Sequence, residues 1–228
     1  MVYNQDTLKS MVGQPVLVIS PHGLDEVLGC GGTITRHAEA GDRVDVLVLF
    51  GDGGGMDVQR RIAAPQAAAI LGATAPYFVG LPENLGDTLP LVDVVGAVER
   101  AVRDLAPRVV YVTHGGNLHI DHQTAFRATL TALRPVPGSP IRAIYGYEIL
   151  SSTEWAPRGV GEGFRPNRFV DITAGLERKM QALECYAAEM RAPPHSRSME
   201  SVRVLAAHRG ATVGVAAAEA FDVVREIA

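Results

Sequence analysis

Cysteine is scarce in this chain, which contains only Cys30 and Cys185 in 228 residues, far apart in the sequence. A chain of this length can bury a hydrophobic core large enough to fold without covalent cross-links. We therefore expect no disulfide framework, and we expect both thiols to be reduced.

The chain also lacks an excess of positive charge and any long apolar run. Its 21 Lys and Arg face 25 Asp and Glu, for a formal net charge of -4, which excludes the basic footprint typical of nucleic-acid binding. The start of the chain is polar, and the apolar run Pro15–Ile19 is too short for a signal-peptide core or a membrane span. We expect a cytoplasmic protein that binds neither nucleic acid nor membrane, and the sequence is compatible with a homo-oligomer.

Short β-branched runs alternate with segments of helical apolar spacing. The alternation predicts βαβ units and a doubly wound, mostly parallel, Rossmann-like sheet covered on both faces. The predicted strands are Val16–Ile19, Val44–Phe50, Tyr77–Val79 and Val109–Val112, and the predicted helices are Gly29–Ala40, Val58–Leu71, Leu91–Leu105 and Asp121–Leu133.

The pattern changes after Pro135, where a Pro/Gly stretch precedes a predicted strand at Ala143–Tyr147 and a long loop at Ser151–Asn167. A helical stripe follows, for which Thr173 is the predicted N-cap, and an Ala-rich helix is predicted at Val215–Ile227. The stripe consists of Leu176, Met180, Leu183 and Met190. With neither a linker nor a repeat in view, we expect one α/β domain over residues 1–228.

The first predicted strand leads into a short polar turn that contains His22 and Asp25, followed by a Gly-rich helix start. In open α/β sheets, ligands bind in the crevice beyond the carboxyl ends of the strands. An imidazole and a carboxylate three residues apart in such a turn can converge on one ion. A lone histidine at a strand end is, however, more often a structural hydrogen-bonding residue.

The fourth predicted strand ends in a second cluster, in which His114, His119, Asp121 and His122 lie within nine positions. Two such clusters at equivalent strand ends favour a metal site, and histidine with carboxylate suits Zn²⁺ with one open position for catalysis. The alternative makes Asp121 a helix N-cap and leaves His119 and His122 on the surface.

The Gly-rich run after the second strand contains Asp52, which could bind a sugar hydroxyl or simply belong to a turn. The run lacks the Lys-Ser/Thr pair of a phosphate-binding loop, so a nucleotide cradle is excluded. Cys30 is interpreted as a small apolar core residue and not as a ligand.

These motifs resemble those of the PIG-L or LmbE-like zinc-dependent N-deacetylases, whose first motif reads His-Pro-Asp-Asp-Glu and whose second reads His-x-Asp-His. The chain matches the first motif with His22, Asp25 and Glu26, and it matches the second with His119, Asp121 and His122. Later matching segments include Tyr147–Trp155, Pro194–Ser198 and Ala218–Phe221, so the resemblance covers almost the whole chain.

The resemblance implies a hydrolase that removes an N-acetyl group from an amino sugar, which could be linked to a nucleotide. It implies that His22, Asp25 and His122 hold the zinc ion, that His119 stabilises the oxyanion, and that Asp121 orients or charges His119. Three residues of the later segments are candidates for contact with the substrate. They are Glu148, His195 and Arg197.

One departure from the family pattern concerns the general base. The first aspartate of the Asp-Asp pair aligns with Leu24, which cannot accept a proton. Glu26 is the nearest carboxylate and is our candidate base, although it could instead hold a ligand in place. The alternatives are a catalytically impaired member that binds a sugar or nucleotide sugar, and a metal-dependent hydrolase of another bond.

Overall fold

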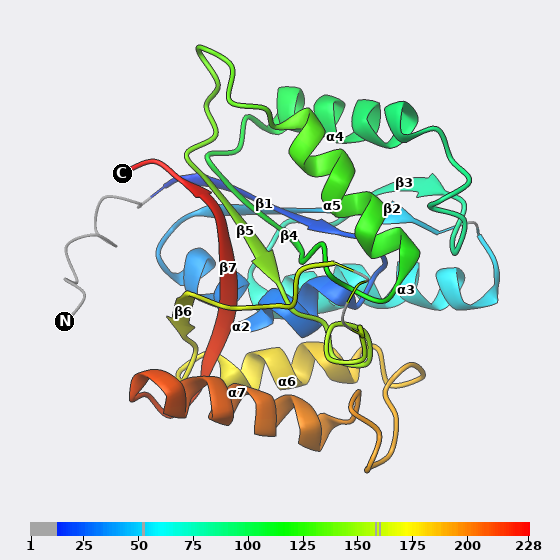
Figure 1. The fold of residues 1–228 in the computed structure, drawn as a ribbon. Helices are drawn as coiled ribbons and strands as arrows, with labels where there is room; N and C mark the ends of the chain where they lie inside the picture. Colours follow the sequence, from blue (N-terminus) through cyan, green and yellow to red (C-terminus); the bar gives the residue numbers. More distant parts are fainter. Residues whose placement is uncertain (1–12, 52, 158, 160) are drawn as a thin grey trace.

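The computed structural model describes residues 13–228 except positions 52, 158 and 160, and the described residues form one α/β domain. Strands and helices alternate through most of the chain, and two further strands and two helices follow β5 (Figure 1). The strands are β1 Pro15–Ser20, β2 Arg43–Phe50, β3 Tyr77–Leu81, β4 Val109–Thr113, β5 Ala143–Tyr147, β6 Arg168–Asp171 and β7 Ala218–Glu226. The helices are α2 Asp25–Glu39, α3 Gly55–Leu71, α4 Leu91–Leu105, α5 Ile120–Ala132, α6 Leu176–Glu184 and α7 Met199–Val213.

The seven strands form one sheet in the order β3-β2-β1-β4-β5-β7-β6. The first five strands of this order are parallel, and β7 pairs antiparallel with both β5 and β6. The strand order reverses between β1 and β4, which are direct neighbours in the sheet. Their carboxyl ends border the crevice in which doubly wound proteins bind their ligands.

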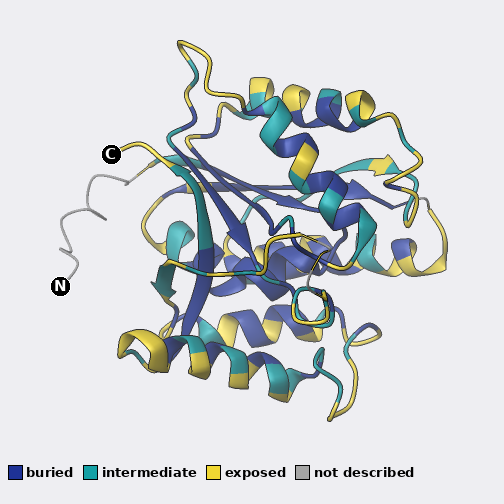
Figure 2. Ribbon diagram, viewed as in Figure 1, coloured by how far each residue is buried: buried dark blue, intermediate teal, exposed yellow. Residues whose placement is uncertain are grey.

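Helices cover both faces of the sheet, as predicted. Helices α4 and α5 lie on one face, and α2 and α3 lie on the other, where α6 packs on α2 and α3, and α7 packs on β7 and β6 (Figure 1). The central strands β1, β2, β4 and β5 are almost continuously buried (Figure 2), as expected for a parallel sheet, whereas the edge strands β3 and β6 are partly exposed. None of the described helices is long and apolar enough to cross a membrane.

Two predictions for the C-terminal part are wrong. Most of the Ala-rich segment predicted as a helix at Val215–Ile227 forms strand β7, whose first half pairs with β6 and whose second half pairs with β5. Residue Thr173 is not an N-cap, since α6 begins at Leu176 and the Thr173 hydroxyl donates to Asp171. Tertiary pairing therefore overrides a local composition that favours helix.

Strand β7 also brings a buried charge to helix α2. The Glu219 carboxylate accepts the backbone N–H groups of Gly32 and Thr33 at 2.9 and 2.8 Å. The Lys179 Nζ atom donates to Glu219 and to the carbonyl of Leu28, both at 2.7 Å. Each charged group is therefore paired and hydrogen-bonded, which a buried ion pair requires.

The glycines of α2 allow close packing against the sheet. A Cβ atom at Gly29 would overlap the ring of Tyr147, and one at Gly32 would lie 2.6 Å from Cβ of Ile172. The Tyr147 ring cannot move away freely, because its hydroxyl donates to the Ile19 carbonyl at 2.8 Å. These glycines therefore position the helix that begins with Asp25.

We expect Gly29→Ala to lower the free energy of unfolding by about 1–3 kcal/mol, the usual cost of overpacking a core. Chemical denaturation followed by circular dichroism measures this change. Gly55→Ala is the matched control, because a Cβ atom at this position of α3 meets nothing within 4 Å. Equal stability of the two variants would contradict the packing role of Gly29.

Candidate metal centre and active site

A tight turn after β1 positions the first pair of candidate ligands. The Asp25 N–H donates to the His22 carbonyl at 3.3 Å, and Leu24 inside this turn has a φ of 100°. A positive φ is costly for leucine, and such strained residues cluster at functional sites. The turn brings the His22 ring over the start of α2, where Asp25 is the first residue.

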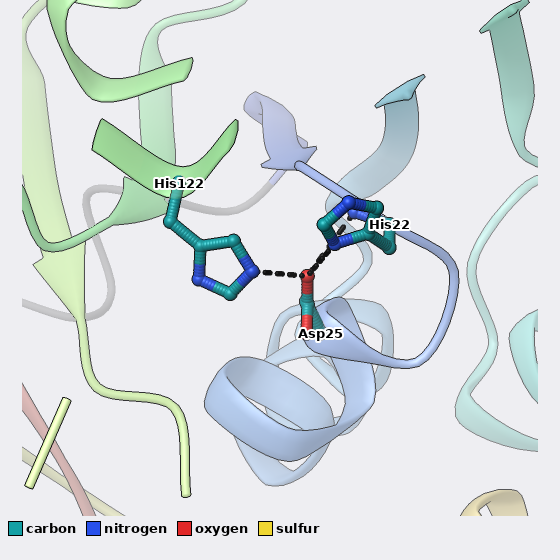
Figure 3. A group of neighbouring side chains, drawn as sticks. All are labelled: His22, Asp25 and His122. Carbon is teal, nitrogen blue, oxygen red and sulfur yellow. Dashed lines mark hydrogen bonds and ion pairs between the residues drawn. The ribbon is translucent and has the colours of Figure 1, made fainter. Parts of the chain in front are cut away.

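The side chains of His22, Asp25 and His122 converge at the switch point of the sheet (Figure 3). Oδ2 of Asp25 lies 3.3 Å from Nδ1 of His22 and 3.2 Å from Nε2 of His122. A tetrahedral zinc ion with bonds of about 2.0–2.2 Å separates its ligand atoms by roughly 3.3–3.6 Å. Both Asp25–His separations are close to this spacing, and all three donor atoms lie within 4.8 Å of one another, so the set suits a zinc ion in chemistry and in these distances.

The electrostatics of this cluster favour a positive charge. Burial lowers the pKa of His22, but hydrogen bonds with Asp121 and Asp25 outweigh it and raise the pKa to about 9. Burial raises the pKa of Asp25, yet His122 and His22 hold it well below its usual range. A divalent cation meets the same demand for positive charge once the histidine proton has left.

The carboxylate of Asp121 hydrogen-bonds a candidate metal ligand, His22, and not the ring of His119. Its Oδ2 accepts from Nε2 of His22 at 2.8 Å, so the His22 ring is held with Nδ1 facing Asp25. The same carboxylate accepts the backbone N–H groups of Asn84 and Gly86 at 2.7 and 2.9 Å. A carboxylate on the outer nitrogen of a ligating histidine is the usual support of a metal site.

The His119 side chain is the N-cap of α5, and its Nδ1 accepts the backbone N–H of Asp121 at 3.2 Å. The ring centroid lies 4.9 Å from that of His22 and 4.8 Å from that of His122. Burial, followed by the charges of these two histidines, lowers the pKa of His119 to about 4. The charge of Asp121 raises this pKa but is outweighed, so the ring is neutral with its proton on Nε2, and the role of Asp121 toward His119 stays a prediction.

Neither Leu24 nor Glu26 has the surroundings of an exposed base. The Leu24 side chain is buried in the core cluster that covers the α2 face of the sheet. The Glu26 carboxylate accepts from the hydroxyls of Tyr186 at 2.7 Å and Ser20 at 3.1 Å, and burial raises its pKa to about 7. These contacts describe a residue that braces the turn, and its role as base stays a prediction.

The other predicted substrate residues are distributed around the site. Asp52 lies outside the described residues. Glu148 forms a two-bond ion pair with Arg209, at 2.8 and 2.7 Å, which occupies both of its oxygens. His195 and Arg197 lie in the loop between α6 and α7, where the Arg197 N–H donates to Nδ1 of His195.

An ion-pair network beside His22 escaped the sequence analysis. Arg60 on α3 donates to Glu83 at 2.7 Å and to both oxygens of Glu189 at 2.7 and 2.9 Å. Oε1 of Glu83 lies 4.0 Å from Nε2 of His22. Glu83 follows the end of β3 and could have been found by its strand-end position, but nothing local in the sequence points to Arg60 or Glu189.

Fold and cluster together define a class, the doubly wound α/β proteins with a His/Asp metal site at the switch point of the sheet. Within that class, the family model described as PIG-L, GlcNAc-PI de-N-acetylase, matches residues 17–133, just over half of the chain. The chain belongs to this family, which places it among the metal-dependent amidohydrolase enzymes.

Individual relatives of known name or structure share less than a third of their aligned residues with this chain. The uncharacterized deacetylase YaiS of Escherichia coli is 29% identical over 147 residues, covering 60% of this chain and 75% of that protein. The 4-oxalmesaconate hydratase of Pseudomonas putida is 27% identical over 205 residues, covering 76% and 73%. The solved structure of the conserved protein TT1542 from Thermus thermophilus matches with a TM-score of 0.76 and 26% identity, over 94% of this chain and 96% of that one.

We expect about one zinc ion per chain after purification with zinc, and a sharp loss of metal in His22→Ala, Asp25→Ala and His122→Ala. A site with three protein ligands cannot easily spare one of them. Elemental analysis gives the occupancy, and His208→Ala on the exposed face of α7 is the control. Negligible metal in the wild-type protein would contradict the assignment.

We expect Asp121→Asn to weaken zinc binding by about 10- to 100-fold, the usual cost of removing the group that supports a ligating histidine. Competition with a chromophoric chelator measures the affinity. Asp104→Asn on the exposed part of α4 should leave it unchanged. If His119→Ala weakens zinc binding and Asp121→Asn does not, the support of His22 by Asp121 is disproved.

Proposed function

We propose that this protein is a zinc-dependent hydrolase that removes the N-acetyl group of an amino sugar, free or linked to a nucleotide. The spacing of the donor atoms of His22, Asp25 and His122 carries this proposal. Membership of a family described as GlcNAc-PI de-N-acetylases supports it, because the group removed there is also an acetyl group on an amino sugar. The cytoplasmic location and a homo-oligomeric state stay predictions from the sequence.

A zinc ion held by these three residues would polarise the amide carbonyl and lower the pKa of water to about 7. The protein supplies the remaining functions. Asp121 fixes the ring of His22 by accepting from its Nε2. His119 lies beside both histidines, and its Nε2–H can donate to the oxygen that becomes negative when the carbonyl is attacked.

Leu24 favours a second candidate function. With an apolar side chain at the family's base position, general base catalysis worth about 10²- to 10⁴-fold has to come from another group, or the reaction differs. One relative is named a hydratase, so similar chains include enzymes that are not named as deacetylases. The second candidate is therefore a metal-dependent hydrolase that cleaves a bond other than the N-acetyl amide. A sugar-binding protein without catalytic activity is the remaining alternative.

The test is acetate release from a panel of N-acetylated amino sugars and nucleotide sugars, measured with the zinc-loaded protein. An active wild type supports the deacetylase. A zinc-loaded wild type that releases no acetate from any member of the panel, and that is not activated by Leu24→Asp, would overturn it.

If Leu24 alone limits the rate, Leu24→Asp should raise amide hydrolysis, because a carboxylate then occupies the position of the family base. If Glu26 is the base, the wild type is already active and Glu26→Gln should abolish turnover, because an amide cannot accept the proton. Under that second outcome, Leu24→Asp should leave the rate unchanged or lower it, since it adds a negative charge beside Asp25. Steady-state rates of acetate release separate the two cases.

We expect His119→Ala to lower kcat by about 10²- to 10³-fold while the zinc content stays at the wild-type level, since one oxyanion donor is lost. Kinetics and elemental analysis on the same preparation check both parts. Loss of zinc in this variant would instead make His119 a ligand.

A further inference from the structure

Trp155, the only tryptophan of the chain, lies in the loop after β5 and is half exposed, with a relative exposure of 50%. A tryptophan that served only the core would be buried, because this side chain has the largest apolar area to remove from water. Its indole instead contacts the ring of His195, with the centroids 5.5 Å apart and the planes at 69°. Two loops far apart in sequence thus meet through these two rings.

The loop that carries Trp155 is fastened to the His119 side of the metal cluster. The Leu118 N–H donates to the Ser152 carbonyl at 3.3 Å, and the Ser152 hydroxyl donates to Oδ1 of Asn117. The same Asn117 oxygen accepts the backbone N–H of His119 at 2.9 Å. The loop that carries Trp155 is therefore held to the segment that positions His119, the predicted oxyanion residue.

The loop that carries His195 is linked to His22 of the cluster through ion pairs. The Arg197 N–H donates to Nδ1 of His195 at 3.0 Å, and Nη1 of Arg197 lies 3.9 Å from Glu189. Glu189 belongs to the ion-pair network of Arg60 and Glu83, which reaches His22. The two rings thus connect a loop that is hydrogen-bonded near His119 with a loop that is linked by ion pairs to His22.

The same contacts fix the chemistry that the two rings offer to a ligand. Because Nδ1 of His195 accepts the backbone N–H of Arg197, the ring nitrogen left to donate a hydrogen bond is Nε2. Among the residues that the structure describes, this Nε2–H has no hydrogen-bond partner. The pair therefore offers an aromatic surface and, beside it, one hydrogen-bond donor.

We propose that Trp155 and His195 form a binding platform for the pyranose ring of the substrate, a proposal that rests on the proposed deacetylase function. A pyranose has an apolar face of C–H groups, which packs on an indole, and a rim of hydroxyls, which accept from an imidazole N–H. An acetylated amine without a sugar ring would use the zinc site but not this platform. The platform therefore selects acetamido sugars over other acetamides.

The first test uses the fluorescence of the wild-type, zinc-loaded protein, because all tryptophan emission comes from Trp155. Titration with the methyl glycoside of N-acetylglucosamine should shift or quench this emission with saturation, and N-acetylglycine amide should not. No change with the glycoside at concentrations that saturate turnover, or an equal change with both compounds, would overturn the proposal.

The second test uses variants at the platform. Trp155→Ala should raise KM for the acetamido sugar roughly 3- to 10-fold, the scale of one lost aromatic contact, with kcat within about 2-fold of the wild type. Trp155→Phe should recover part of the loss, and His195→Ala should also raise KM. Tyr77→Ala is the matched control, because Tyr77 is also 50% exposed but lies at the amino end of β3. Equal KM values for Trp155→Ala and Tyr77→Ala would reject the platform.

The two proposals fail in different ways. A wild type that releases no acetate, but whose emission responds to the glycoside and not to N-acetylglycine amide, retains the platform and loses the deacetylase. A wild type that releases acetate without any response of Trp155 retains the deacetylase and loses the platform.

Discussion

The candidate site depends on one buried hydrogen bond, from Nε2 of His22 to Asp121. This bond joins the residue after β1 to the helix after β4, across the point where the strand order reverses. It leaves Nδ1 of His22 facing Asp25, and the remaining capacity of Asp121 holds the loop at Asn84 and Gly86. One carboxylate therefore orients a candidate metal ligand and fixes an adjoining loop, and because Asp121 is buried, salt screens this interaction much less than it would at the surface.

The sequence predicted what depends on local pattern and on strand ends. Alternating strands and helices gave the doubly wound sheet, and the rule that ligands bind at strand ends brought His22 and His122 together in advance. Prediction from the sequence failed where two interacting residues lie far apart along the chain. The resemblance implied that Asp121 acts on His119, whereas its carboxylate binds His22, far away in the sequence, because no local pattern shows which way a buried carboxylate points. The helix predicted at Val215–Ile227 was wrong for a similar reason, because this segment pairs with β5 and β6, which lie far away in the sequence.

The altered first motif and the ion-pair network of Arg60 form one structural unit. A Cβ atom at Gly23, where the family motif has proline, would lie 3.2 Å from Cβ of Arg60. Glycine at this position therefore gives the stem of Arg60 room to pass over the turn and reach Glu83 and Glu189. Two departures from the motif, Gly23 and Leu24, thus accompany a charged network that the motif alone does not reveal. The turn after β1 therefore differs from the family motif in two residues, and the charged groups of Arg60, Glu83 and Glu189 lie close to it.

The pair formed by Lys179 and Glu219 has a consequence for how the protein is made. Helix α2 carries Asp25 near the start of the chain, yet backbone groups in its middle are bound by side chains from α6 and β7. Contacts between residues so far apart form late, because closing the intervening loop costs entropy before it is repaid. On the ribosome, the segment with Asp25 emerges long before Glu219 is synthesised. The nascent protein therefore completes the packing of the helix that begins with Asp25 only after β7 has been translated and inserted between β5 and β6.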